Sequence, residues 1–212
     1  MNDLAGRRIV VSAGGTREPI DPVRYIGNRS SGKMGFALAD AAKERGASVT
    51  LVTTIIPPDP DYYDEVRYVE TVAEMRVAVL DACRSADVLV MAAAVADYRV
   101  ANPADQKIKK KGGKLVLELV ETADFLLELP DDFVKIGFAA ETQDLLKNAE
   151  KKLIEKRLNF ICANDVSAPD SGFAVDTNRI TIIYKDGRQE ALPLMSKREV
   201  ADKILDRAAE LL

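Results

Sequence analysis

The 212-residue chain contains no histidine and only two cysteines, Cys83 and Cys162. The absence of histidine removes the commonest metal ligand and general base, so any proton transfer falls to Lys, Asp, Glu or Tyr. Two cysteines are too few for a disulfide framework, and both lie in apolar patterns that predict buried positions in the core.

Long apolar runs and an excess of basic residues are also missing. No stretch approaches the roughly 20 apolar residues that span a bilayer, and the first residues lack the basic-then-apolar layout of a signal peptide. We therefore expect a cytoplasmic protein with no membrane segment. The formal net charge of −4 argues against general binding to nucleic acid or to a membrane surface, so local groups must hold any anionic ligand.

What is present is an alternation of short apolar strands and amphipathic helices. With 47% hydrophobic and 30% charged residues, the composition is typical of a globular protein, and we expect one domain over residues 1–212. The patterns predict strands at 8–13, 48–53, 66–69, 86–94, 115–120, 134–139 and 159–163, and helices that begin near 34, 71, 142 and 196. This order predicts an α/β fold with a mostly parallel, doubly wound sheet.

Local signals mark several boundaries. Helix caps are expected at Thr71 with Glu74, at Ser196 with Glu199, at Thr122 and at Thr142. The dipeptide Asp186-Gly187 predicts an antiparallel hairpin added to the sheet, because it favours positive φ at both turn positions. Pro19 and Pro22 exclude a regular helix over 17–27, so we expect a long ordered loop there.

The stretch 27–35, GNRSSGKMG, is rich in small hydrogen-bonding residues and runs into an apolar-periodic helix. Glycines let the backbone approach a ligand, and the first N–H groups of a helix have no partner inside it, so this stretch is suited to hold an anion. Its spelling matches GxxxxGK. However, Met34 stands where a P-loop needs Ser or Thr for Mg²⁺, and no apolar strand ends in an Asp that could be the second metal anchor.

A dinucleotide-dependent oxidoreductase would suit the predicted fold but not the motifs. Gly14-Gly15-Thr16 does not continue into GxGxxG, and the second strand ends in Thr53-Thr54 where an acidic residue would bind a ribose. Two alternative functions stay open at this point. One is an NAD(P)-dependent oxidoreductase, and the other is a nucleotide-binding module without catalysis.

Residues 100–114, which we call the flap, are rich in lysine and contain Gly112-Gly113. Such a run is often only a solvated loop. Here it follows a strand whose carboxyl end should face a crevice, so we expect a mobile flap that brings ammonium groups onto a polyphosphate. Asp97 ends the small-residue run 92–96, which leaves room for a ligand ring, and its carboxylate could accept hydrogen bonds from ribose hydroxyls or simply cap a loop.

Several segments together resemble one family, phosphopantothenoylcysteine synthetase, the ligase of coenzyme A biosynthesis. The motifs occur in matching order over nearly the whole chain: GGTREPIDPVRYIGNRSSGKMG at 14–35, AAAVADYR at 92–99, KIKK at 107–110, GFAAET at 137–142 and ANDVS at 163–167. The resemblance implies a Rossmann-like fold, a homodimer and a two-step reaction. The carboxylate of 4′-phosphopantothenate attacks the α-phosphate of CTP, and the amine of cysteine then displaces CMP from the acyl cytidylate.

The resemblance also implies site residues at the matching positions. Asn28 and Lys107 would be catalytic, Asn28 by handling the acyl cytidylate and Lys107 by meeting the nucleotide phosphates from the flap. Substrate binding would involve Arg24, Asn28, Ser30, Ser31, Gly32 and Ala94. Nucleotide contacts would be Met91, Ala92, Ala93, Asp97, Lys107, Ala123, Asp124, Phe125, Leu126, Phe138, Lys152 and Lys156, of which 123–126 differ most from the family in side chains.

The co-substrates and partners follow from the same resemblance. CTP is expected instead of ATP because the SSGKMG and KIKK patterns look bacterial, and Mg²⁺ is expected to arrive on the phosphates of CTP. No flavin is expected in this chain. Many bacterial members also carry an amino-terminal flavin-dependent decarboxylase domain, and the sequence fits an excised domain and a freestanding enzyme equally well.

Overall fold

Eight strands form the main sheet of the computed structural model, which describes residues 2–110, 112–141, 143–165, 172 and 175–212. Their spatial order is β13-β12-β10-β9-β6-β1-β4-β5, and every neighbouring pair from β10 to β5 is parallel. The strands are β1 (Arg8–Ala13), β4 (Ser48–Thr53), β5 (Glu65–Tyr68), β6 (Val88–Met91), β9 (Val134–Glu141), β10 (Phe160–Asp165), β12 (Ile180–Tyr184) and β13 (Gln189–Ala191). From β5 onward the parallel strands follow the Rossmann order 3-2-1-4-5-6, so the expected fold class is confirmed.

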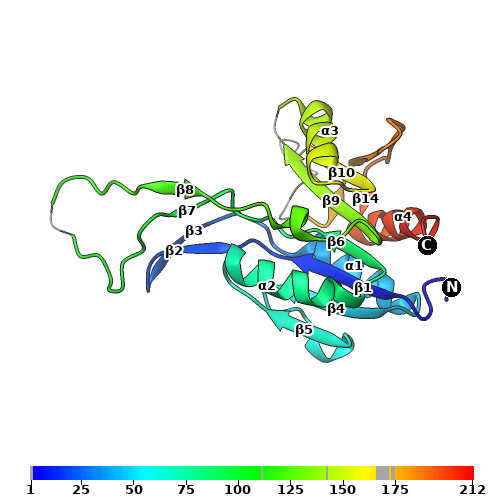
Figure 1. The fold of residues 1–212 in the computed structure, drawn as a ribbon, viewed down its shortest axis with the longest axis horizontal. Helices are drawn as coiled ribbons and strands as arrows, with labels where there is room; N and C mark the ends of the chain where they lie inside the picture. The colour runs from blue at the N-terminus through cyan, green and yellow to red at the C-terminus, as the bar shows by residue number, and fades with distance from the viewer. Residues whose placement is uncertain (1, 111, 142, 166–171, 173–174) are drawn as a thin grey trace.

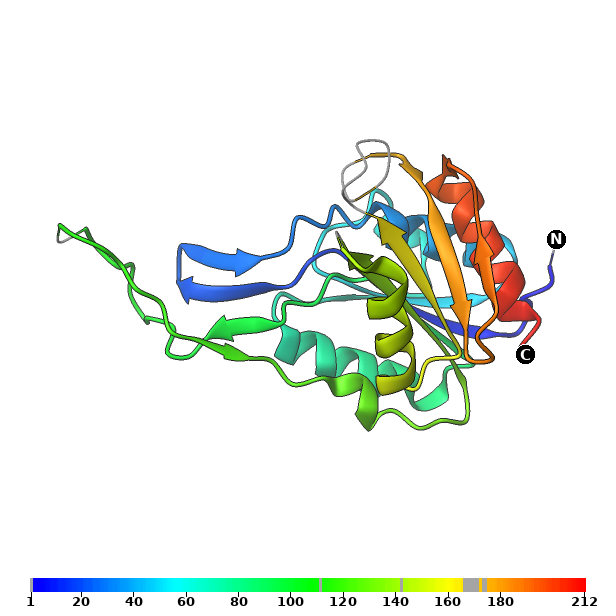
Figure 2. The ribbon, with the colours of Figure 1, turned by 90° about the horizontal axis from the view of Figure 1, so that it is seen from above.

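Helices cover both faces of this sheet, as Figures 1 and 2 show. On one face α1 (Lys33–Glu44) packs beside α4 (Lys197–Ala209), and on the other lie α2 (Val72–Ala82) and α3 (Leu145–Glu155). Side chains of each buried strand alternate between the two faces, so in β1 Ile9 and Val11 join the first core while Val10 joins the second. This double burial explains why the central strands β1 and β6 contain short apolar runs.

The helix starts agree in part with the local signals. Both capping boxes are present, with Thr71 opening α2 and Ser196 opening α4. The predicted cap at Thr122 is wrong, because the short 3₁₀ turn η3 (Phe125–Glu128) is capped by Asp124, whose side chain accepts from Leu126 N. The predicted cap Thr142 lies outside the described residues, and the residue that precedes α3 is Asp144, with φ of 48°. Two further 3₁₀ turns are η1 (Pro60–Tyr62) and η2 (Cys83–Ser85).

The predicted loop over 17–27 is instead an antiparallel hairpin of β2 (Arg17–Asp21) and β3 (Arg24–Gly27). Proline is compatible with this two-stranded ribbon because its edges leave some N–H positions without a ladder partner. The strand expected at 115–120 is shorter and does not join the main sheet. It is β8 (Leu119–Glu121), which pairs with β7 (Tyr98–Val100).

The two hairpins together form a feature that we call the arm, residues 17–27 and 98–121. Figures 1 and 2 show it reaching away from the body of the fold, with the flap between β7 and β8. The base of the arm is fixed to α2, because the buried carboxylate of Glu18 accepts a hydrogen bond from Val72 N at 2.8 Å. The mobility expected of the flap stays a prediction.

The predicted hairpin of β12 and β13 is confirmed, but its turn differs from the expectation. Only Gly187 has positive φ, at 83°, and Gly187 N donates to Tyr184 O at 3.0 Å. The connection is therefore a type I turn followed by a left-handed glycine, the usual three-residue hairpin loop. A further small pair joins β11 (Thr177–Asn178) to β14 (Met195–Ser196).

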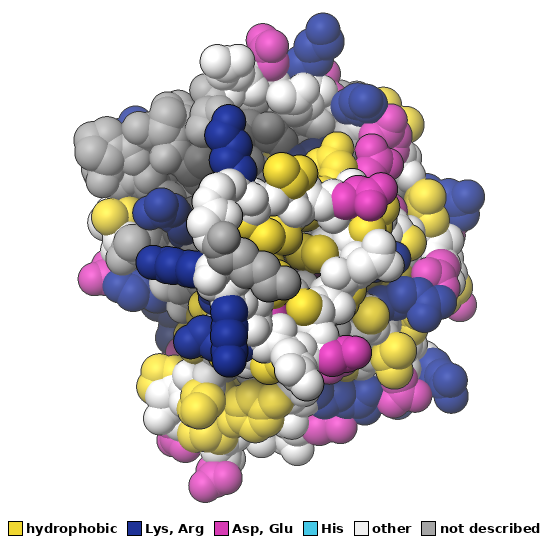
Figure 3. Space-filling model, turned by 90° about the vertical axis from the view of Figure 1, so that its left-hand side faces the viewer, with side chains coloured by type: hydrophobic (Ala, Val, Ile, Leu, Met, Phe, Trp, Pro, Cys, Tyr) yellow, Lys and Arg dark blue, Asp and Glu magenta, His cyan; other side chains and the backbone are white. Residues whose placement is uncertain are grey.

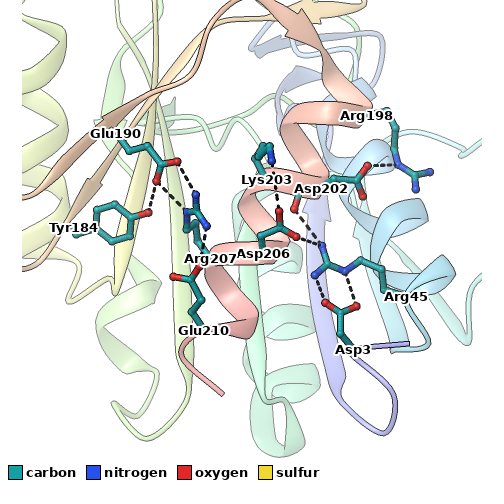
Figure 4. A network of polar contacts seen from close by, with 10 residues as sticks. All are labelled: Asp3, Arg45, Tyr184, Glu190, Arg198, Asp202, Lys203, Asp206, Arg207 and Glu210. Atoms are coloured by element: carbon teal, nitrogen blue, oxygen red, sulfur yellow. Dashed lines mark hydrogen bonds and ion pairs between the residues drawn. The ribbon is translucent and has the colours of Figure 1, made fainter. Parts of the chain in front are cut away.

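Ion pairs dock α4 onto the end of α1 and onto the antiparallel edge, as Figure 4 shows. Arg45, whose side chain is 9% exposed, donates to Asp3, to Asp206 at 3.0 Å and to the Asp202 carbonyl oxygen at 3.1 Å. On the other side Arg207 binds Glu190 at 2.8 Å. Among the described residues, no helix is both long and apolar enough to cross a membrane.

Candidate functional site

The candidate site begins at the carboxyl ends of β1 and β6, which are neighbours in the middle of the sheet. The loop that leaves β6 lies against the loop that leaves β1, because Ala94 N donates to Gly14 O at 2.8 Å and Thr16 N donates to Ala94 O at 3.2 Å. Thr16 Oγ1 also accepts from Ala96 N at 2.9 Å. In a sheet of this order, neighbouring strands whose connections run in opposite directions open a crevice at this position.

Asn28 is held against this pair of loops. Its amide Nδ2 donates to the carbonyl oxygens of Ala94 at 3.1 Å and Val95 at 3.3 Å. The approach requires glycine, since a Cβ on Gly15 would stand 2.9 Å from Asn28 O and one on Gly27 would stand 2.6 Å from Thr16 O. The two glycines of the motif therefore let the Asn28 segment pack directly on the strand ends.

A cavity of about 370 Å³, the main cavity, opens beside Asn28 between the ends of β6 and β9, α3 and η3. This volume is within the usual range for small-molecule sites. The structure brings together here all of the predicted nucleotide contacts except Lys107, and Asn28 and Ala94 line it as well. Those gathered nucleotide contacts are Met91, Ala92, Ala93, Asp97, Ala123, Asp124, Phe125, Leu126, Phe138, Lys152 and Lys156.

Charged groups enter the main cavity from two walls. Lys152 in the last turn of α3 and Lys156 at its C-terminal cap are both half-buried, and both line the cavity. Lys156 Nζ lies 3.1 Å from Asp124 Oδ2, and the exposed Asp97 lines the cavity as well. The cavity thus offers ammonium groups for phosphates and a carboxylate for hydroxyl groups, next to an apolar floor.

A smaller cavity of about 50 Å³ adjoins the main one and shares Ala92, Phe138 and Ala140 with it. It lies at the start of α1, where Gly32 has φ of 75° and where the predicted anion contacts Ser30, Ser31 and Gly32 line the wall. The first N–H groups of a helix attract anions. The small cavity is therefore suited to a compact, negatively charged group.

Lys197 lines the same small cavity from the start of α4. It is 6% exposed, and its ammonium donates to the carbonyl oxygens of Gly172, at 2.9 Å, and Val175. Burial lowers the pKa of Lys197, and the nearby Lys33 acts in the same direction. The ammonium group of Lys197 therefore adds a positive charge to the field at the start of α1.

Arg24 and Lys107 lie elsewhere, on the arm. Neither is among the described residues that line the two cavities. Arg24 follows the turn of the β2–β3 hairpin, and Lys107 is an exposed residue of the flap. Figure 3 looks onto the carboxyl edge and the arm, where a hollow with apolar side chains lies beside a group of Lys and Arg side chains.

Sequence reasoning missed several lining residues. Gly137, Leu158, Ile161, Val95 and Thr122 line the main cavity. Gly137 carried a usable signal, because a glycine inside an apolar strand often marks a close approach. Here a Cβ would stand 2.5 Å from Leu158 Cδ1. Lys197, Asn164 and Asn178 in the small cavity come from segments far apart in sequence, and no spacing rule connects them.

The described parts of the chain contain no cluster of three His, Cys, Asp or Glu side chains that could hold a metal ion. A third hollow, of about 460 Å³, lies at the amino ends of the strands near Arg8, Cys83 and Phe133. Ligands of such sheets bind at the carboxyl ends. The two adjoining cavities are therefore the candidate site.

Comparison with known proteins shows the family to which the chain belongs. The family model described as "DNA/pantothenate metabolism flavoprotein C-terminal domain" matches residues 4–212. The chain is 46% identical over 212 residues to the coenzyme A biosynthesis bifunctional protein CoaBC of Bacillus subtilis (strain 168), covering 98% of this chain and 52% of the relative. The chain thus spans about half the length of the curated relatives that it matches.

Solved structures show the same fold. The crystal structure of the C-terminal domain of a coenzyme A biosynthesis bifunctional protein CoaBC superposes with a TM-score of 0.81 at 40% identity, covering 100% of this chain and 98% of that one. A Cab2 mutant H337A in complex with phosphopantothenate-cysteine gives a TM-score of 0.77 at 16% identity, with coverage of 96% and 87%. At that identity the second likeness shows the fold alone.

Proposed function

Because the chain belongs to the family of the DNA/pantothenate metabolism flavoprotein C-terminal domain, we propose that it is a ligase of coenzyme A biosynthesis. It joins 4′-phosphopantothenate to L-cysteine and uses CTP to activate the carboxylate. The relative of similar sequence is named a coenzyme A biosynthesis bifunctional protein, and the fold neighbour with phosphopantothenate-cysteine in its name carries the product of this reaction.

The observation that carries the proposal is the convergence of residues in the main cavity. Residues predicted for one nucleotide come from four separate segments of the sequence, yet they line a single cavity beside Asn28. In the proposed complex, the ammonium groups of Lys152 and Lys156 neutralise phosphate charge. The backbone and the small side chains of 92–94 leave room for the sugar and base.

The reaction proceeds in two steps, activation of the carboxylate and formation of the amide. A carboxylate oxygen of 4′-phosphopantothenate forms a bond to the α-phosphorus of CTP, and the bond from that phosphorus to the bridging oxygen breaks, so pyrophosphate leaves. The cysteine amine then attacks the acyl carbon, the bond from that carbon to the phosphate oxygen breaks, and CMP leaves with loss of one proton from nitrogen. Both steps depend mainly on positioning and on stabilisation of negative charge.

The site divides naturally between the two halves of the acyl cytidylate. The cytidylate occupies the main cavity, and the small cavity at the start of α1 attracts a negatively charged group of 4′-phosphopantothenate. Asn28 lines the main cavity, and the residues that follow it, from Ser30 onward, line the small one. Asn28 therefore stands at the boundary, next to the mixed anhydride.

Mg²⁺ fits this site as an ion carried by the nucleotide. Magnesium keeps several waters and commonly binds one or two carboxylates together with substrate phosphates. Asp97 and Asp124 are exposed carboxylates that line the main cavity. Asp124 already pairs with Lys156, so Asp97 is the one that could contribute a ligand. When bound, the ion would neutralise charge on the phosphates and on the departing pyrophosphate.

The arm is best explained by a homodimer, which we propose as the working form. Its exposed apolar side chains include Val23, Tyr25 and Tyr98, with exposed fractions of 58%, 55% and 48%. Large apolar groups gathered on a projecting element favour burial against a partner. Because the arm leads Lys107 away from the cavities of its own chain, we propose that Lys107 serves the site of the second copy.

The chain would then act as the synthetase half of a bifunctional protein or as a protein of its own. The decarboxylase half and the cytoplasmic location stay predictions. Of the alternative functions, a dinucleotide oxidoreductase is not favoured, since Thr53 ends β4 where the acidic ribose ligand would stand.

The test is pyrophosphate release with 4′-phosphopantothenate, cysteine and each nucleoside triphosphate in turn. We expect release with CTP and formation of phosphopantothenoylcysteine, and much slower release with ATP. A chain that binds CTP without releasing pyrophosphate would be the non-catalytic module instead.

A further inference from the structure

The turn of the β2–β3 hairpin contains a buried carboxylate with an unusual number of donors. The Asp21 side chain is 0% exposed, and its oxygens accept hydrogen bonds from Val23 N at 2.9 Å and from Arg24 N at 3.1 Å. They also accept from Arg24 Nε and Nη2, at 3.1 and 2.5 Å, and from Ile108 N at 3.1 Å. A turn of this kind needs only the bonds from Val23 N and Arg24 N. The bonds from the Arg24 side chain and from Ile108 N therefore have another cause.

The two oxygens divide this work. Oδ1 accepts the N–H groups of the turn, whereas Oδ2 accepts the Arg24 guanidinium and the N–H group of Ile108. Arg24 Nη2 in turn donates to Ile108 O at 3.0 Å. The backbone N–H and C=O groups of Ile108 are thus both bonded to the Asp21–Arg24 ion pair.

A second contact strengthens the attachment of the flap. Ala104 N donates to Ile20 O at 2.9 Å. The segment between Ala104 and Ile108 is therefore held at both ends by residues 20, 21 and 24 of the neighbouring hairpin, while Gly112-Gly113 lies beyond the attachment. The hydrogen bond from Arg24 keeps the pKa of Asp21 well below its usual range, so the carboxylate is charged at neutral pH.

We propose that Asp21 is a positioning residue that fixes Lys107 on the arm for its contact with the nucleotide phosphates. Lys107 immediately precedes the clamped residue, so its backbone cannot move without Ile108. The clamp orders this backbone before CTP binds, which removes an entropy loss from the binding step. The inference rests on the proposed function, because the role of Lys107 does.

The variant Asp21→Asn separates this role from that of the turn. The amide oxygen of Asn still accepts Val23 N and Arg24 N, but its NH₂ group faces two donors, Arg24 and Ile108 N, that need an acceptor. The matched control is Asp105→Asn, which removes one exposed acidic charge from the same flap.

The first measurement is steady-state kinetics with each of the three substrates. We expect Asp21→Asn to raise KM for CTP about tenfold or more, as for loss of one charge-assisted hydrogen bond. KM for cysteine should stay within about twofold of the wild type. An unchanged KM for CTP overturns the proposal, and so does an equal rise in KM for every substrate, because that pattern indicates general damage to the fold.

The second measurement needs no substrate and so does not depend on the ligase activity. Trypsin cleavage after Lys107, Lys109 and Lys110 is followed in the folded protein. Asp21→Asn should be cut about tenfold faster than Asp105→Asn, since cleavage requires local release of the segment. Equal rates would overturn the proposal. Failure of the wild type to release pyrophosphate with CTP would refute the proposed function instead, and the trypsin result would still decide whether Asp21 fixes the segment.

Discussion

Replacing Asn28 by Asp reverses the polarity of one contact at the boundary of the two cavities. In the wild type the amide donates to the carbonyl oxygens of Ala94 and Val95. A carboxylate at the same place presents oxygen to oxygen at about the same distances. Both bonds are lost, and the loop 92–97 that forms one wall of the main cavity is pushed outward.

The size of the effect follows from those two bonds. Each neutral hydrogen bond contributes about 0.5–1.5 kcal/mol, so the loss is about 1–3 kcal/mol. If the wall must return to its native position for the reaction, kcat/KM falls about 5- to 150-fold. Because Asn28 stands beside the proposed acyl cytidylate, we expect the cysteine-dependent step to lose more than the first step, and the acyl cytidylate to accumulate.

The assay follows both steps separately. Pyrophosphate release in a single turnover without cysteine reports the first step, and the amount of phosphopantothenoylcysteine formed after cysteine is added reports the second. The matched control is Asn148→Asp on α3, where the amide also donates to a backbone carbonyl, that of Gln143 at 3.1 Å, but outside both cavities.

Three outcomes are informative for this variant. A slower second step in Asn28→Asp together with a normal Asn148→Asp supports the reasoning. Wild-type kinetics in Asn28→Asp would refute it, because the structure leaves that carboxylate no acceptable partner among the two carbonyls. Equal losses in both variants would show that the change acts on folding and not on the site.

Three more predictions test other parts of the structure. Gly137→Val should raise KM for CTP about tenfold, because a Cβ there meets the Leu158 side chain at 2.5 Å in the floor of the main cavity; a titration of CTP against pyrophosphate release checks this. Glu190→Gln should lower the free energy of unfolding by about 1–2 kcal/mol at pH 7, measured with urea, since the hydrogen bond from Arg207 lowers the pKa of Glu190 to about 2. This stabilisation is present above the ordinary glutamate pKa and is lost as pH falls toward 2, so the difference from the wild type should shrink over that interval. Mixing the subunits of Lys107→Gln with those of Asn28→Asp should add about a quarter of wild-type activity to what the separate variants retain if Lys107 acts on the partner's site, and should add nothing if Lys107 acts within its own chain.

The sheet and its helices were predictable because local and global signals agree. Val10 and Val11 bury their side chains on opposite faces, so the centre of β1 is apolar. Thr71 and Ser196 cap their helices with neighbours three residues away. The β2–β3 hairpin was not predicted, because Pro19 and Pro22 contradict a strand of a main sheet but are tolerated in a short ribbon.

Local patterns predicted parts of the candidate site, at 27–35 and 92–97, whereas the full set of lining residues was predictable only through the family motifs. Small residues such as Ala92 and Ala93 have no chemical signature of their own, and their meaning comes from the cavity that they line. The clamp of Asp21 on Ile108 joins residues 87 positions apart through a backbone N–H group. No pattern of side chains along the sequence records such a bond, because every non-proline residue offers the same donor.

The most direct test of the ligase proposal is a cysteine-free incubation of the protein with 4′-phosphopantothenate, CTP and Mg²⁺. We predict that pyrophosphate appears in an amount equal to the number of sites, that mass spectrometry finds 4′-phosphopantothenoyl-CMP, and that added cysteine converts this species to phosphopantothenoylcysteine and CMP. Absence of both pyrophosphate and the acyl cytidylate, in a protein that binds CTP, would contradict the proposed function.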